Sequence, residues 1–130
     1  MKIEVSVGEV VDKVTILEIK LERVRNEEKL KHIRLEYDLL KQAMQSVGMT
    51  AESEVFRELK AVNLRLWEIE DKIRLKEKSK KFDDEFIELA RSVYLQNDRR
   101  SEIKKRISME MGSRIIEEKE YVEYDRPGPV

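Results

Sequence analysis

The fold is decided by residues 10–24, Val10-Val11-Asp12-Lys13-Val14-Thr15-Ile16-Leu17-Glu18-Ile19-Lys20-Leu21-Glu22-Arg23-Val24. Within this stretch an apolar residue recurs at alternating intervals of four and three. That spacing keeps one side of an α-helix against a partner helix. The same apolar stripe continues, in three blocks, through Val10, Val14, Leu17, Leu21 and Val24; Leu30, Ile33, Tyr37, Leu40, Met44 and Val47; and Val55, Leu59, Val62, Leu66, Ile69 and Ile73.

The composition fits long, folded helices. Charged residues make up 42% of the chain but cancel to a net charge of −1, and 40% of the residues are hydrophobic. A disordered chain with so many charges is usually unbalanced and poor in large apolar groups. At 130 residues we expect a single helical domain over residues 1–126 and an irregular tail over 127–130.

Polar caps and glycines divide the apolar stripe. The segment Ser6-Val7-Gly8-Glu9 fits a capping box, in which the Ser6 hydroxyl and the Glu9 carboxylate accept from the first amides of a helix expected over 7–25. The stripe slips by one residue near Asn26, which favours a break capped by Asn26; local overwinding is the alternative. Gly48 suits the left-handed residue that ends a second helix.

The second half of the chain contains at least two more helices. Thr50 is expected to cap a third helix over 51–78, which a short link forces antiparallel to the second. Asp83 is expected to cap the next helix, with Phe82 stapled against Ile87. Asn97-Asp98 either caps a fifth segment or lies within one helix over 83–111. Residues 2–5 and 120–124 alternate polar and apolar side chains, which predicts short β-like ends.

Two phrases stand out: Gly8-Glu9-Val10-Val11-Asp12-Lys13-Val14-Thr15-Ile16-Leu17-Glu18-Ile19-Lys20-Leu21-Glu22, and residues 88–107 from Glu88-Leu89-Ala90-Arg91 to Lys105-Arg106-Ile107. Together they resemble a family of short bacterial and phage proteins that carry a domain of unknown function. The resemblance covers residues 2–124. It implies a helical fold and a place among polysaccharide and glycosyltransferase genes, and it assigns no activity, substrate or catalytic residue.

The residues most suggestive of a polar site lie on the first, third and fourth helical stretches. They are Asp12, Asp71, Arg91, Tyr94, Asn97, Asp98 and Arg99. An enzyme would draw several of them into one concave pocket, whereas a scaffold would leave them on solvated faces. Helix capping alone explains Asn97-Asp98, with solvated arginines beside it.

Two enzyme classes offer partial parallels. Glu68-x-x-Asp71 and Glu85-x-x-Glu88 place pairs of acids one helical turn apart, where both could reach Mg²⁺. All-α nucleotide pyrophosphohydrolases are similar in using such pairs, but in the opposite order. Helical chorismate mutases are similar in holding a dianion with basic side chains from several helices, for which Lys20, Arg23, Arg91 and Arg99 are candidates with Asp12. A salt-bridged helix face explains the acid pairs more simply.

Other functions lack a signal. The balanced charge argues against nucleic-acid binding, and no stretch of 18 apolar residues could span a membrane. Zero cysteines remove disulfides and thiolate chemistry, and the four isolated glycines make no phosphate-binding loop. We expect no cofactor and no metal, and a cytoplasmic location.

The sequence therefore predicts an all-α protein, built as an antiparallel long-helix hairpin or bundle with coiled-coil packing. Phe56, Leu64 and Trp67 give the third helix a second apolar side, and such helices usually pack against two neighbours. We expect a homodimer and interpret the protein as a non-enzymatic interaction or scaffold protein with a protein partner, accessory to surface-polysaccharide synthesis if the resemblance holds. The alternative is a small all-α enzyme acting on a phosphorylated or carboxylated metabolite.

Overall fold

A computed structural model describes residues 1–127 of the chain. It contains four helices: α1 (Val7–Arg23), α2 (Glu27–Ser46), α3 (Glu54–Lys78) and α4 (Asp84–Glu110). No strand occurs within residues 1–127. The all-α prediction is therefore confirmed, and the predicted β-like ends at 2–5 and 120–124 are wrong. Among the same residues, no helix is both long and apolar enough to cross a bilayer.

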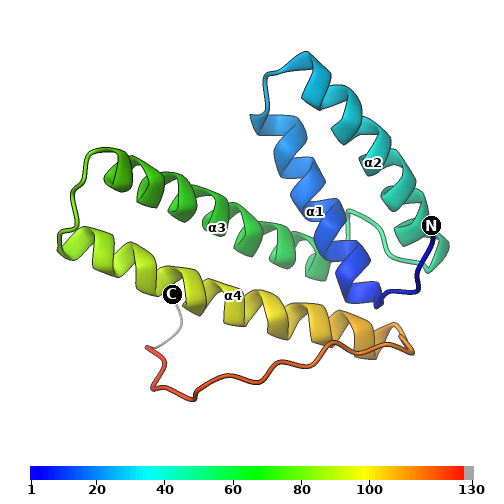
Figure 1. The fold of residues 1–130 in the computed structure, drawn as a ribbon. Helices are drawn as coiled ribbons and strands as arrows, with labels where there is room; N and C mark the ends of the chain where they lie inside the picture. The colour runs from blue at the N-terminus through cyan, green and yellow to red at the C-terminus, as the bar shows by residue number, and fades with distance from the viewer. Residues whose placement is uncertain (128–130) are drawn as a thin grey trace.

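The helices form two pairs that cross each other (Figure 1). α1 packs on α2, α3 packs on α4, and α1 also packs against both helices of the second pair. Because α2 and α3 do not pack on each other within the described residues, the predicted antiparallel pairing of the second and third helices is wrong. The crossing lies at the start of α3 and the end of α4. The rest of the second pair projects away from α2 and, beyond the Arg23–Glu68 ion pair at its base, from α1; we call residues 68–93 the arm. Within residues 1–127, no third helix covers the outer part of the arm.

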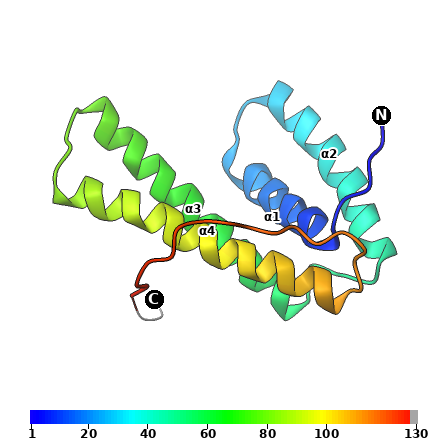
Figure 2. The ribbon, with the colours of Figure 1, turned by 60° about the horizontal axis from the view of Figure 1, so that its bottom comes forward.

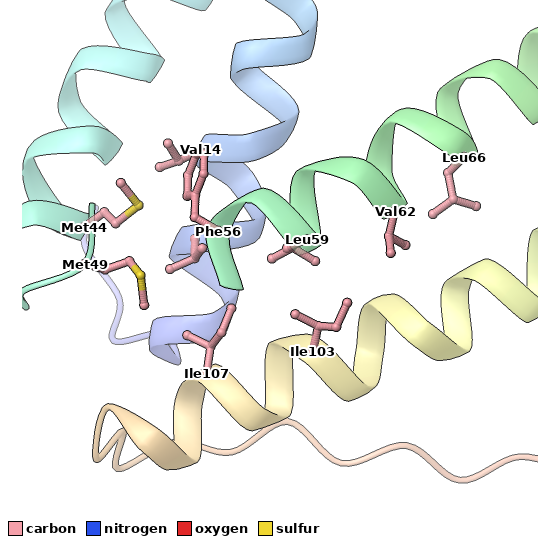
Figure 3. Packing of buried hydrophobic residues seen from close by; sticks show 10 residues of the cluster. Val14, Met44, Met49, Phe56, Leu59, Val62, Leu66, Ile103 and Ile107 are labelled. Carbon is pink, nitrogen blue, oxygen red and sulfur yellow. The ribbon is translucent and has the colours of Figure 1, made fainter. Parts of the chain in front are cut away.

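The apolar core lies at the crossing and takes side chains from all four helices. Phe56, at the start of α3, is 1% exposed and sits beside Val14 of α1, Met44 of α2 and Ile107 of α4 (Figure 3). Burying a side chain of this size contributes about 2–3 kcal/mol. The apolar stripe therefore does its main packing where the two pairs meet.

A single glycine sets how closely the two pairs approach. A Cβ built on Gly8 would lie 2.1 Å from the Lys104 backbone oxygen and 2.8 Å from Ser108 Oγ. The Gly8 amide donates to Ser108 Oγ at 2.9 Å, and the Val7 amide donates to Ser113 Oγ at 3.2 Å. The start of α1 is thereby fixed directly against the backbone of α4.

Each of the four helices has a polar side chain as its N-cap. Ser6, Asn26, Ser53 and Asp83 each accept from the backbone amide three residues on, at 3.0–3.2 Å. The predicted break at Asn26, the Asp83 cap and the left-handed Gly48 (φ +88°) are confirmed. A second left-handed glycine, Gly112 (φ +68°), follows α4. These caps supply acceptors for amides that have no partner within the helix.

Several predicted boundaries are wrong. Ser53, not Thr50, caps α3, because residues 50–52 form a turn first. Phe82 packs edge-on against Phe86, with centroids 5.2 Å apart, and Ile87, its predicted partner, is 52% exposed. The Glu9 carboxylate accepts from Lys104 Nζ, so only the Ser6 half of the capping box was predicted correctly.

The fourth helix is continuous. Asn97 and Asp98 lie inside α4, so of the two alternatives the single helix is correct and the fifth segment is wrong. Beyond α4 the chain turns at Gly112 and runs back along the helix without regular secondary structure (Figure 2). We call residues 113–127 the C-terminal strap. Most of the expected irregular tail over 127–130 lies outside the described residues.

Candidate functional site

The main polar cluster of the molecule is built around Asp12, which is 1% exposed on α1. Arg100 of α4 holds it with two bonds, Nε to Oδ1 at 2.9 Å and Nη2 to Oδ2 at 2.5 Å. Asn63 Nδ2 of α3 donates to Oδ1 at 2.8 Å and to Thr15 Oγ1 at 2.9 Å. One buried carboxylate therefore links three helices.

The Asp12–Arg100 pair has the geometry of a strong, directional contact. Two parallel N–H···O⁻ bonds between a guanidinium and a carboxylate fix the relative orientation of both planes. The hydrogen bond to Asp12 raises the pKa of Arg100, so the guanidinium keeps its charge at neutral pH. Arg100 stays partly accessible, with 31% of its side chain exposed.

Lys104, one turn after Arg100 on α4, extends the cluster to the C-terminal strap. Its Nζ donates to Glu9 Oε2 at 2.8 Å, lies 3.9 Å from Asp12 Oδ2, and lies 3.6 Å from Glu117 on the strap. The pKa of Glu117 is lowered, first by its hydrogen bond to Lys119 and then by the charge of Lys104. The strap is thus attached to the same ion-pair cluster that joins α1 to α4.

A second set of contacts holds the far end of the strap on Asp98. Tyr124 donates its hydroxyl to Asp98 Oδ2, and its ring meets Tyr94 edge-on with centroids 5.3 Å apart. Arg126 Nη2 lies 3.6 Å from the same oxygen, and Arg126 Nη1 donates to Glu102 at 2.6 Å. The bond to Asp98 raises the pKa of Tyr124 to about 12, so this hydroxyl remains a donor at neutral pH.

Between α4 and the strap there is a polar pocket of about 210 Å³. Its walls combine five α4 residues with two residues of the strap. The lining residues are Asn97, Asp98, Arg100, Ser101, Lys104, Lys119 and Tyr121. Three of these side chains are cationic and one is anionic; Asp12, Glu9 and Glu117, which pair with the three cations, stand outside the lining.

The candidate residues named from the sequence separate into two groups. Asp12, Asn97 and Asp98 meet at this pocket or, for Asp12, directly behind its Arg100 wall. Asp71 and Arg91 are exposed, and Arg91 is paired with Glu88 at 2.9 Å. Tyr94 is 45% exposed and contacts the strap.

Arg99 belongs to a different hollow. It lines a groove of about 410 Å³ between α3 and α4, whose other charged side chains are Glu58, Arg65, Glu102 and Arg106. The groove and the strap pocket share no α4 residue, although both are lined by the stretch from residue 97 to residue 106. No group of three or more His, Cys, Asp or Glu residues within 1–127 is placed to hold a metal ion.

Sequence reasoning missed the two basic residues at the centre of the cluster, Arg100 and Lys104. A signal was present for Arg100, because Arg100, Ile103 and Ile107 follow the same three-then-four spacing and so share the inward face of α4. Asn63 could have been found similarly, as a polar residue beside the buried Val62. Nothing in the sequence indicated that the strap returns over α4.

The fold and site together define a class: an all-α protein of two crossed helical pairs, with a strap that covers a polar pocket. The chain belongs to DUF6165, a family of unknown function, and the family model matches residues 1–129. No curated protein matches it, and no solved structure does.

Proposed function

We propose that this protein is a non-enzymatic interaction protein that assembles as a homodimer through the arm. The observation that carries the proposal is an apolar groove of about 430 Å³ on the arm, between α3 and α4. Ile73, Phe86 and Val93 line it, with charged side chains at its rim. Apolar surface of this kind on a projecting element usually marks an interface.

The charge pattern of the arm favours a second copy of the chain as the occupant. On α3, residues 68–71 carry three acids and residues 72–78 carry four bases and one acid. On α4 and its cap, residues 83–88 carry four acids and residues 89–93 carry one base. Towards the tip of the arm α3 therefore changes from acidic to basic, whereas α4 carries its acids at the tip and its one basic residue nearer the base of the arm. Two such arms laid antiparallel bring opposite charges face to face.

Two-fold symmetry makes this arrangement self-complementary. In an isologous contact both copies use the same patch. The acidic segment of one copy therefore faces the basic segment of the other, and the two-fold axis repeats this pairing with the copies exchanged. Antiparallel arms also place each copy's α1–α2 pair beyond the tip of the other arm, which avoids a collision between them. The result is a four-helix contact with the grooves buried at its centre.

A matched pair of substitutions tests the proposal. Ala90 is exposed on α4 and lies between Phe86 and Val93 on one helical face, so Ala90→Glu places a charge beside the groove without touching the core. Ala43→Glu makes the same change at an exposed position of α2. Sedimentation velocity should give twice the 15.5 kDa chain mass for the native protein and for A43E, and the monomer mass for A90E.

A native chain that sediments as a monomer at tens of micromolar would contradict the proposal. A dimer that survives in A90E would show that the arm groove is not its interface. A cytoplasmic location and an accessory role in surface-polysaccharide synthesis extend the proposal, and their support is the sequence resemblance to short bacterial and phage proteins.

A further inference from the structure

We propose that the pocket between α4 and the C-terminal strap binds a tetrahedral oxyanion, a phosphate group. This inference does not depend on dimerisation, because the pocket lies on α4 at the strap and is formed by one chain. Its volume of about 210 Å³ is below the range of drug-sized sites, which suits a small ionic group.

The lining is made almost entirely of hydrogen-bond donors. Arg100, Lys104 and Lys119 bring positive charge, and the Ser101 hydroxyl, the Asn97 amide and the Tyr121 hydroxyl can donate without charge. The donors come from two opposite walls, the helix and the strap. A phosphate group presents acceptor oxygens in all directions, so it can bond to both walls at once, whereas a carboxylate presents its two oxygens in one plane.

Arg100 is oriented for this task by the carboxylate behind it. Asp12 accepts from Nε and Nη2 of Arg100, and among residues 1–127 nothing accepts from Nη1. A guanidinium has five N–H groups in a rigid fork, so the bonds to Asp12 leave donors free on the other side. The buried pair therefore holds the guanidinium in place before any ligand arrives, which reduces the entropy lost on binding.

The one acid in the lining is already satisfied. Asp98 receives the Tyr124 hydroxyl and lies 3.6 Å from Arg126, so its charge is offset from the strap side. A free carboxylate here would repel an anion, whereas a carboxylate bonded in this way serves to anchor the strap. Because two walls share the ligand, bound phosphate should also hold the strap more firmly on α4.

The test is a titration of the full chain, labelled with ¹⁵N, with inorganic phosphate and separately with glycerol phosphate at constant ionic strength. The expected result is a saturable shift of the backbone amide signals of Asn97, Ser101 and Lys119. Tighter binding of glycerol phosphate would identify the ligand as the phosphate group of a larger molecule. Tighter binding of inorganic phosphate would identify the free ion.

Two lysines provide a matched pair of variants. Lys119 lines the pocket and is paired with Glu117 at 3.0 Å; Lys105 lies outside its lining and is paired with Glu118 at 3.0 Å. Each substitution by alanine removes one positive charge and one strap ion pair. Lys119→Ala should weaken phosphate binding about tenfold, the worth of one charge-assisted hydrogen bond, and Lys105→Ala should change it less than twofold. Ser101→Ala should weaken binding without altering the charge.

Three outcomes would overturn the proposal. These are shifts that stay linear in phosphate concentration, saturable shifts centred on residues outside the pocket, and equal weakening by K119A and K105A. The last would mean that phosphate responds only to the overall charge of the surface.

Discussion

Truncation of Asp12 and truncation of Arg100 should both lower the free energy of unfolding, and the loss should be larger for Arg100. Truncating one partner of a buried ion pair costs about 3–5 kcal/mol, because the other partner keeps an uncompensated charge. In Asp12→Ala the remaining Arg100 is 31% exposed and can be hydrated, so we expect about 3 kcal/mol. In Arg100→Ala the remaining Asp12, which is 1% exposed in the native protein, keeps Asn63 at 2.8 Å and Lys104 at 3.9 Å but loses its two-bond partner, so we expect about 5 kcal/mol.

The double variant D12A/R100A separates a structural pair from two independent effects. Because neither charge is then left unpaired, the double variant should lose about 3 kcal/mol, well below the sum of the single losses. The assay is urea unfolding followed by circular dichroism at pH 7. Protein concentration must be held fixed, since association with a second copy would add to the apparent stability.

Additive losses in the double variant, or single losses below about 1 kcal/mol, would refute the reasoning. Either result would mean that the pair behaves as an exposed salt bridge.

Three further predictions concern the crossing and the strap. Gly8→Ala should cost about 3 kcal/mol in urea unfolding, at the upper end for overpacking, because its Cβ would lie 2.1 Å from the Lys104 oxygen; a change under about 1 kcal/mol would contradict this. Phe56→Ala should cost about 3–5 kcal/mol in the same assay, because Phe56 fills the core where all four helices meet. The pKa of Tyr124 is raised from 10.0 to about 12, so its contribution to strap docking is complete below pH 10 and is lost as the pH rises through 12. Protease cleavage of the strap should increase over that interval in the native protein, and Tyr124→Phe should be cleaved faster at neutral pH with no such transition.

Much of the fold could be predicted because it depends on local patterns. The apolar stripe identified the helices, and capping chemistry placed the breaks at Asn26 and Asp83 correctly. Errors arose where a local signal was ambiguous. Alternating residues at 120–124 resemble a strand, but the strap has no neighbouring strand to pair with and bonds to α4 through side chains. Asn97-Asp98 resembles a cap, but these residues serve the strap from within a continuous helix.

The crossing of the two helical pairs could not be predicted from the stripe. A heptad pattern specifies that a helix has a partner along one side, and it does not specify which helix or at what angle. The crossing depends on the close contact of Gly8 with the backbone near Lys104, which joins positions 96 residues apart. In sequence Gly8 has an equally good explanation as part of a capping segment.

The candidate site was predicted only in part for a related reason. Asp12, Asn97 and Asp98 were chosen by residue type and do lie at the strap pocket or next to it. Their partners Arg100 and Lys104 were passed over because they belong to a basic run that suggests a solvated face. Only the return of the strap over α4 makes those residues the walls of a pocket, and that return is fixed by long-range side-chain contacts such as Tyr124 with Asp98.

The most direct test of the arm-to-arm dimer uses the absence of cysteine from the chain. Ala90→Cys introduces one thiol on the α4 side of the arm, between Phe86 and Val93, where antiparallel arms bring it close to its own copy. Treatment with a short bismaleimide should convert most of the A90C protein to covalent dimer, and should leave Ala43→Cys on α2 monomeric on a denaturing gel. Equal cross-linking of the two variants, or none in A90C, would contradict the account.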